Sequence, residues 1–352
     1  MARQIINGPK ILLMKVLNNK NISLVVAVIA STYLYAIEPI AYLNSLGYEP
    51  AQKEIASSKN GMITTQHFLA TQVGEKILNR GGNAYDASIA VAFTLAVVLP
   101  RAGNIGGGGF MVIYDKETEQ PYTIDFREKA PELSTKDMYL NKDGSFNDKN
   151  LSTVGYLAIG VPGTVAGLWE VHQKFGSLPW NELIEDAIYY AENGFEITPF
   201  LADILLRYSE SLSLFAETKE IFQLHYPNFK NKTLVQKDLA NTLKIIASNG
   251  RKGFYEGEIA KIMSDFIIEQ GGFLSYDDLK NHNSEWIDPV STNYRGFDIW
   301  ELPPNGQGIA ALQILNLLEA YDIKSMGFGS AEYIHHFTEA KKIAFADRAK
   351  YY

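Results

Sequence analysis

The pattern of hydrophobic and polar positions in the first part of the chain predicts two helices followed by a hairpin. Residues from about Thr65 to Arg80 have helical spacing and end at Gly81-Gly82, as expected for a helix with glycine just past its end. The next stretch, Asp86 to Val98, is apolar on nearly every side, so we expect a buried helix that is too short to cross a bilayer. Two short runs, Phe110 to Tyr114 and Tyr122 to Phe126, flank a polar stretch and predict an antiparallel hairpin.

The later part of the chain has a mostly helical pattern. From about Thr164 to Glu319 this pattern is interrupted by the strand-like stretch Trp286 to Trp300 and by a turn at Pro303 to Gly306. Ala331 to about Tyr351 reads as an amphipathic helix, and Ser330 before it is a favoured N-cap residue. This last helix continues to the chain end without a stop signal, so we expect the sequence to be truncated.

The N-terminal residues have the layout of a targeting segment. Three lysines among the first 20 residues precede an apolar run from Ile22 to Ile37. We predict that residues 1–36 are a signal peptide, or alternatively an uncleaved N-terminal anchor, and that residues 37–60 form an extended mature N-terminus. The protein would then be periplasmic or extracellular, or anchored in a membrane and facing outside.

Composition narrows the possible functions. The 352 residues are 46% hydrophobic and 20% charged, which is typical of a folded protein with a sizeable core. The net charge of −8 and the scattered basic residues argue against a nucleic-acid partner. Because the chain has no cysteine, a thiol nucleophile and a thiolate metal site are excluded, and any nucleophile must be a hydroxyl, an amine or a carboxylate.

Arg127 is the candidate binding residue. Strand alternation places Thr123, Asp125 and Arg127 on one polar face of the second strand of the hairpin. A guanidinium on such a face can clamp a carboxylate with two parallel hydrogen bonds, a geometry that lysine cannot imitate. The alternative is a structural arginine that only pairs with Asp125 or Glu128.

Other polar and glycine-rich motifs indicate structure more than chemistry. The run Gly106 to Gly109 precedes a strand and not a helix, so it predicts close packing and not a nucleotide site. Thr164 follows a Pro/Gly turn, where a capping or packing role is expected. No HExxH pattern occurs, and His335 and His336 project about 100° apart on a helix, so we predict no metal site.

Taken in order, several segments resemble the γ-glutamyltransferase family. They are RGGNAYDASIAVAF, PRAGNIGGGGFMVIYD, TIDFREKAP, GVPGTVAGL, LANTLKIIASNG, FYEGEIA, YRGFDIWELPP and AEYIHHFTEAKKIAFADRAKYY. Each segment alone is a weak signal, but together they are collinear from about Gly61 to Tyr352. Residues 61–352 therefore resemble the large-subunit region of this family.

The resemblance implies an α/β (α+β) fold, the αββα sandwich of an N-terminal nucleophile hydrolase, incomplete without the small subunit. Such a precursor cuts itself into two subunits, and the new N-terminal threonine attacks the γ-glutamyl amide of glutathione or another γ-glutamyl compound. The γ-glutamyl group then passes to water, an amino acid or a dipeptide. The implied partners are the small subunit and these small molecules, and no cofactor is implied.

Site residues are carried over by motif. Arg127 in TIDFREKAP matches the family arginine that binds the α-carboxylate of the donor, and Asp125 and Glu128 would orient its guanidinium. The catalytic threonine is expected beyond Tyr352, so no catalytic residue is assigned in this chain. At residues 303–308, PPNGQG stands where the family has a Pro-rich stretch followed by Ser-Ser-Gly-Gly. Two alternatives remain open: a catalytically dead γ-glutamyl-binding remnant and a related acylase.

For the chain by itself we predict no release of product from a γ-glutamyl anilide, because the nucleophile would lie on the missing part. We also expect it to expose sheet edges and apolar faces that the small subunit would cover. The measurement is an absorbance assay for the released aniline with the purified 352-residue chain. Measurable turnover would contradict the missing nucleophile.

Overall fold

The computed structural model describes residues 56–145, 151–222 and 232–352. The predicted signal peptide or anchor, residues 1–36, lies outside the described residues, as does most of the segment 37–60. Within the described part of the chain, no helix has both the length and the apolar character needed to cross a membrane.

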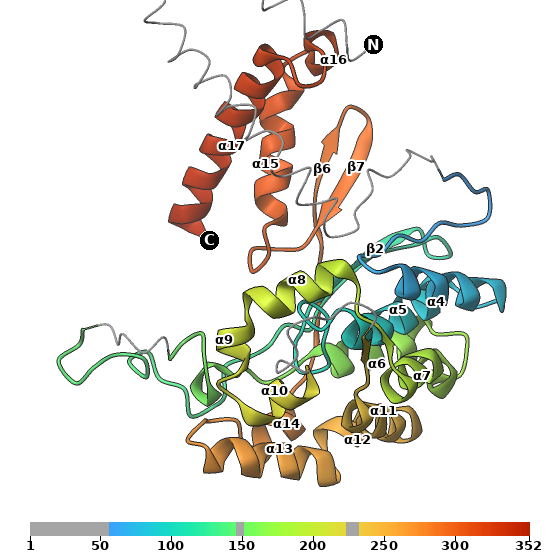
Figure 1. The fold of residues 1–352 in the computed structure, drawn as a ribbon. Helices are drawn as coiled ribbons and strands as arrows, with labels where there is room; N and C mark the ends of the chain where they lie inside the picture. The colour runs from blue at the N-terminus through green and yellow to red at the C-terminus, as the bar shows by residue number, and fades with distance from the viewer. Residues whose placement is uncertain (1–55, 146–150, 223–231) are drawn as a thin grey trace, which may run out of the picture. The chain divides into compact units, whose positions relative to one another are not determined.

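The chain divides into two compact units. Figure 1 labels their helices and strands. In the described part of the chain, the larger unit comprises residues 60–145, 151–195 and 235–352. Its helices are α4 (Phe68–Asn79), α5 (Ala84–Val98), α6 (Thr164–Phe175), α7 (Glu185–Asn193), α11 (Lys237–Asn249), α12 (Lys252–Tyr255), α13 (Gly257–Glu269), α14 (Tyr276–Asn281), α15 (Gly308–Glu319), α16 (Ile323–Met326) and α17 (Ala331–Tyr351), with short 3₁₀ helices at Tyr156–Ala158 and Trp180–Leu183. Its strands are β1 (Phe110–Asp115), β2 (Gln120–Asp125), β5 (Glu285–Ile287), β6 (Val290–Tyr294) and β7 (Phe297–Glu301).

The smaller unit contains the segment Glu196–Leu234. Its described helices are α8 (Pro199–Arg207), α9 (Ser209–Leu212) and α10 (Ala216–Ile221). Two short strands, β3 (Phe195–Glu196) and β4 (Thr233–Leu234), pair at the two ends of this segment. α8 begins after Thr198, whose hydroxyl accepts the N–H of Leu201 at 3.2 Å, and proline at its first position fits an N-terminus where no N–H is required.

The first two predicted helices are confirmed as α4 and α5. α4 begins at Phe68, three residues later than predicted, because the ring of His67 caps it by accepting the N–H of Leu69 at 3.3 Å. α5 begins with a capping box in which Asn83 and Asp86 satisfy each other's backbone N–H groups. Phe93, in the middle of α5, is fully buried, which confirms the predicted core helix.

The predicted hairpin is confirmed as β1 and β2, which pair antiparallel from Phe110↔Asp125 to Asp115↔Gln120. β5 pairs with the other side of β2, giving the sheet order β1-β2-β5. On the predicted polar face of β2, Thr123 is buried where β5 pairs with β2, and its hydroxyl donates to the carbonyl of Ile287.

β1 is an outer strand of this sheet, and two of its large apolar side chains reach solvent. Val112 is 42% exposed and Tyr114 is 61% exposed. Both side chains project from the same face of the strand, since residues two apart point the same way. The expectation that further chain covers such a face stays a prediction.

The stretch predicted as strand-like, Trp286 to Trp300, contains strands β5, β6 and β7, and β6 and β7 pair antiparallel as a hairpin. Figure 1 shows α15 between α17 and this hairpin. α17 is capped by Ser330, whose hydroxyl accepts the N–H of Tyr333 at 3.1 Å, as predicted. The turn predicted at Pro303 to Gly306 is also present, closed by the Gly306 N–H to the Pro303 carbonyl at 3.1 Å.

α6 packs against the end of β2 at very short range. A Cβ at Gly167 would lie 2.1 Å from Cγ of Phe126, whose ring is buried beneath the helix. The helix can approach the strand this closely only because residue 167 has no side chain.

We therefore predict that Gly167→Ala destabilises the protein, although alanine favours a helix more than glycine does by about 1 kcal/mol. The methyl group would push against the ring of Phe126, and such overpacking costs about 1–3 kcal/mol. Urea denaturation followed by circular dichroism measures the change. Gln173→Ala, at an exposed position of the same helix, is the control and should shift stability by less than about 0.5 kcal/mol. A Gly167→Ala variant as stable as the parent would show that α6 can move away from the strand.

Candidate functional site

Arg127 lies directly beyond the end of β2, on a backbone that the hairpin continues to hold. Phe126 and Gly109 exchange two backbone hydrogen bonds of 3.0 and 3.3 Å, so the pairing extends one residue past the strand ends. Phe126 is buried, whereas the side chain of Arg127 is 55% exposed. The fold thus fixes the backbone at this position and leaves the guanidinium accessible.

Within the described residues, the guanidinium of Arg127 makes two weak contacts and no direct hydrogen bond. Its Nε lies 3.8 Å from Oε2 of Glu128, and its central carbon lies 5.6 Å from the centre of the Phe110 ring. Exposed ion pairs at such distances contribute little to stability. The paired donors of the guanidinium therefore remain available for an external carboxylate.

Asp125 holds the backbone at Arg127 and not its guanidinium. Its Oδ1 accepts the backbone N–H of Arg127 at 2.8 Å. Its Oδ2 accepts the side-chain amide of Asn305. The resemblance implied that Asp125 orients the guanidinium; in this structure Asp125 fixes the backbone that carries the guanidinium. Asn305 lies in the segment 303–308, where the sequence differs from the family pattern. Its contact with Asp125 was not predicted.

The glycines at 106–109 form a close-packed turn, as predicted. A Cβ at Gly108 would lie 2.8 Å from Cα of Arg127, so a side chain there would displace the arginine. The carbonyl of Gly107 accepts the N–H groups of Gly163 at 2.8 Å and of Thr164 at 3.0 Å. Thr164 is buried, and its hydroxyl donates to the carbonyl of Asn104 at 3.1 Å, which confirms its packing role.

A cavity of about 300 Å³ opens beside this turn. It is lined on one side by the glycine turn and the start of α6, and on the other by the strand ends, including Phe110, Phe126 and Glu128. Glu128 also pairs with Arg127. Arg127 is not among the lining residues, but Glu128 and Phe110, which its guanidinium contacts, both line the cavity. The cavity is of a size that accepts a small molecule.

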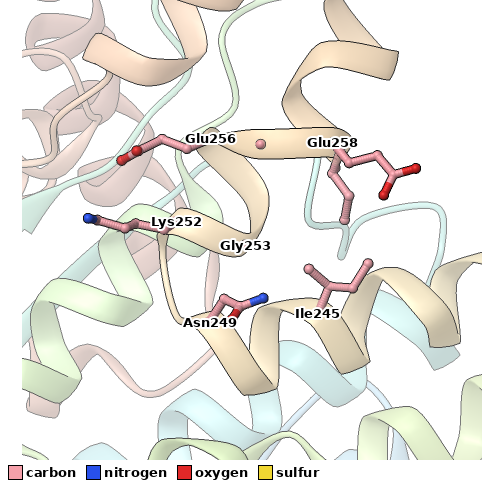
Figure 2. A pocket seen from close by; sticks show the side chains of 8 residues that line it. Ile245, Asn249, Lys252, Gly253, Glu256 and Glu258 are labelled. Atoms are coloured by element: carbon pink, nitrogen blue, oxygen red, sulfur yellow. The ribbon is translucent and has the colours of Figure 1, made fainter.

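A second cavity, of about 510 Å³, lies between α11 and the start of α13. Figure 2 shows the carboxylates of Glu256 and Glu258 pointing to opposite sides of it, with Lys252 on the side of Glu256. Polar groups that diverge in this way do not converge on a ligand. Among the described residues, no group of three or more histidine, aspartate or glutamate side chains could hold a metal ion.

The larger unit contains a buried aromatic pair, Tyr255 and His282, that the sequence did not predict. The rings of Tyr255 and His282 stack with their centres 5.6 Å apart and their planes 8° from parallel. Both are buried, and neither ring nitrogen of His282 has a hydrogen-bond partner among the described residues. Burial, followed by the charges of Lys129 and Arg251, lowers the pKa of His282 to about 4, and only the carboxylate of Glu285 acts in the opposite direction.

The comparisons with known proteins agree over most of the chain. The family described as Gamma-glutamyltranspeptidase matches residues 70–352. The glutathione hydrolase proenzyme of Escherichia coli (strain K12) is 41% identical over 324 residues, which cover 91% of this chain and 56% of that protein. The chain thus spans about half the length of the curated relatives it matches.

Solved structures give the same result. The crystal structure of Helicobacter pylori gamma-glutamyltranspeptidase matches with a TM-score of 0.80 and 41% identity, over 85% of this chain and 86% of that chain. The cephalosporin acylase from Bacillus halodurans matches with a TM-score of 0.78 and 32% identity, over 86% of this chain and 56% of that chain.

These likenesses confirm the predicted class, a mixed helix-and-sheet fold of the N-terminal nucleophile hydrolase type. The chain belongs to the gamma-glutamyltranspeptidase family.

The buried His282 leads to a prediction about pH. Its pKa in the folded state is about 4, below the ordinary value of 6.5, so the unfolded chain takes up a proton first as the pH falls. The stability that this histidine contributes is present above pH 6.5 and is lost between pH 6.5 and 4, by up to about 3 kcal/mol. His282→Phe keeps an aromatic ring against Tyr255 and should lose less stability over that interval.

Urea denaturation midpoints at pH 7 and pH 4.5 measure this difference. His335→Phe, at an exposed position on α17, is the control and should follow the parent protein. Parallel pH curves for the parent and His282→Phe would show that His282 does not titrate differently in the two states.

Proposed function

We propose that this chain supplies the donor-carboxylate clamp of a γ-glutamyltransferase that also acts as a glutathione hydrolase. The observation that carries the proposal is the exposed guanidinium of Arg127, held on a fixed backbone and in contact with Glu128 and Phe110, which line a cavity of about 300 Å³. A guanidinium with free paired donors matches the geometry of a carboxylate. The substrate carboxylate would be the α-carboxylate of the γ-glutamyl donor.

In this proposal the chemistry needs the small subunit of the same precursor as a partner. The hydroxyl of its N-terminal threonine attacks the γ-carbonyl carbon of the donor, with the threonine's own α-amine taking the hydroxyl proton. An ester to the enzyme forms and the amide bond breaks, so that the amine leaves with a proton. Water then releases glutamate, or an amino acid or dipeptide takes the γ-glutamyl group.

The residues of this chain contribute binding and orientation to that reaction. Arg127 would hold the α-carboxylate and so fix the distance from it to the γ-carbonyl. Glu128, 3.8 Å from Nε of Arg127, limits where the guanidinium can swing. Asp125 prevents the backbone of Arg127 from shifting, since it accepts that residue's N–H at 2.8 Å.

The proposed location is the periplasm or the exterior of the cell, with membrane anchorage facing outside as the alternative. Support comes from the lysines and the apolar run within residues 1–36. The division into residues 1–36, 37–60 and 61–352 belongs to the same proposal. Recovery of the chain with residues 1–36 intact in a cytosolic fraction would count against it.

A related acylase is the second candidate function, because a cephalosporin acylase shares the fold at 32% identity. The two candidates differ in what they require of the substrate. A glutaryl anilide keeps the corresponding carboxylate but lacks the α-amino group, so a γ-glutamyltransferase should discriminate against it and an acylase should accept it. A catalytically dead remnant would bind L-glutamate and turn over neither anilide.

The proposal predicts that Arg127→Ala, in the complete protein expressed from its whole gene, lowers kcat/KM for a γ-glutamyl anilide. Removing the guanidinium leaves the substrate carboxylate unpaired, which should cost about 2–4 kcal/mol in transition-state binding. Steady-state kinetics of anilide release measure the loss.

Arg80→Ala is the matched control, because Arg80 forms a surface ion pair with Glu182 at the end of α4. Its kcat/KM should stay within about twofold of the parent value. An Arg127→Ala protein with unchanged kcat/KM would remove Arg127 from the site and the proposal with it.

A further inference from the structure

We propose that Tyr255 is a positioning residue for Arg127: its hydroxyl holds the loop 160–164 in place against the end of β2, and that loop in turn holds the backbone of the arginine. This inference rests on the proposed role of Arg127 in binding the donor. It adds a residue far along the chain, on the short helix α12, to the set that determines donor affinity.

The hydroxyl of Tyr255 is the buried link between α12 and the loop. It donates to the carbonyl of Pro162 at 2.7 Å and accepts the N–H of Ala166 at 3.3 Å. Tyr255 is fully buried, and this burial raises the pKa of its hydroxyl, so the group stays protonated and remains a donor. Water cannot readily replace a hydrogen bond at a site with no exposure.

Backbone hydrogen bonds connect the loop 160–164 both to the segment after Arg127 and to the glycine turn. Val161 and Lys129 exchange two backbone hydrogen bonds of 2.8 and 3.2 Å. On the other side, the N–H of Gly163 donates to the carbonyl of Gly107 at 2.8 Å. The loop therefore connects the segment after the arginine to the glycine turn that packs on it.

The backbone of the loop 160–164 lies in very close contact with the residues that follow β2. A Cβ at Gly163 would lie 1.9 Å from the carbonyl oxygen of Phe126 and 3.0 Å from that of Arg127. A Cβ at Gly160 would lie 2.9 Å from Cβ of Glu128. Backbones in such close contact move together, so a shift of the loop becomes a shift of Arg127.

The ring of Tyr255 is fixed independently of its hydroxyl. One face stacks on His282, and the guanidinium carbon of Arg251 lies 4.8 Å from the ring centre. Arg251 in turn donates to the carbonyls of Lys280, at 3.2 Å, and of His282. Removing only the hydroxyl should leave the ring in place, which makes Tyr255→Phe a selective test.

The experiment measures Tyr255→Phe in the complete protein with a γ-glutamyl anilide. Losing the hydrogen bond to Pro162 lets the loop relax and misplaces the guanidinium, which acts on the part of the donor that does not react. We expect KM to rise about fivefold to tenfold, while kcat changes by less than about twofold. A lower kcat with unchanged KM would overturn the inference.

Tyr276→Phe is the matched control. Its hydroxyl also accepts one backbone N–H, that of Gly257 at 3.2 Å, and within the described residues it has no hydrogen bond to the loop 160–164. It should leave both KM and kcat within about twofold of the parent. An equal rise in KM for both tyrosine variants would mean a general loosening and would overturn the inference.

A double-mutant cycle with Arg127→Ala separates positioning from a structural effect. If Tyr255 acts through the arginine, Tyr255→Phe should change KM by less than about twofold once Arg127 is alanine. An undiminished effect in that background would overturn the inference. If Arg127→Ala itself leaves KM and kcat unchanged, the proposed function fails first; if Arg127→Ala weakens binding and Tyr255→Phe does not, only the present inference fails.

If Tyr255→Phe yields no folded protein, Arg251→Lys tests the same inference. This variant keeps the Tyr255 hydroxyl and weakens only a contact that holds the Tyr255 ring. Lysine cannot reproduce both carbonyl contacts and the planar contact with the ring. The same selective rise in KM is expected, smaller in size and absent when Arg127 is alanine. No rise, or a rise that persists in the Arg127→Ala background, would overturn the inference.

Discussion

The close approach of three backbone segments around Arg127 is the constraint on which the candidate site depends. Gly108 and Gly163 lie against the chain at Phe126 and Arg127, where Cβ atoms would come within 2.8 Å and 1.9 Å of backbone atoms. Glycine at these positions lets hydrogen-bonded backbone, and not side chains, form the walls of the site. Backbone walls are stiff where they are hydrogen-bonded, as at Gly107, Gly109 and Val161, so the exposed arginine stands on a rigid base.

In this arrangement one set of contacts positions the backbone of Arg127, while its guanidinium remains free to bind a ligand. Asp125 and the loop 160–164 act on the backbone, while the guanidinium itself is only lightly held by Glu128. A binding group that is strongly paired within its own protein would have to give up that pairing to bind a ligand. Here the pairing is weak and exposed, so the loss is small. The cavity of about 300 Å³ beside the glycine turn provides the space that binding requires.

Much of this could be predicted from the sequence, because local patterns carry it. The apolar stretch of α5, the hairpin β1–β2, the Ser330 cap and the packing role of Thr164 are all local in sequence and were confirmed. Arg127 emerged from strand alternation and a family motif together. The roles of Asn305 and Tyr255 could not be predicted, because their contacts with Asp125 and Pro162 join positions 180 and 93 residues apart. No periodicity or short motif records such pairings.

The misplaced details have equally physical reasons. α4 starts late because an imidazole, an uncommon cap, accepts the first N–H. Thr123 is buried because β5, which is distant in sequence, pairs with β2. A carbonyl of β5 accepts the hydrogen bond from the Thr123 hydroxyl. Asp125 bonds to the backbone N–H of Arg127 and not to its guanidinium. A short aspartate side chain reaches the backbone two residues on more readily than it reaches the end of a long arginine side chain.

The 180-residue separation between Asp125 and Asn305 also bears on the order in which the molecule assembles. Contacts between distant positions form late, because the chain must close a long loop before they can be made. During synthesis the hairpin β1–β2 can form once residue 125 has emerged, but its aspartate must wait for the loop after β7 before its second oxygen is satisfied. The candidate site can therefore be completed only after residue 305 has been synthesised, and a nascent chain carries Arg127 long before this contact can form.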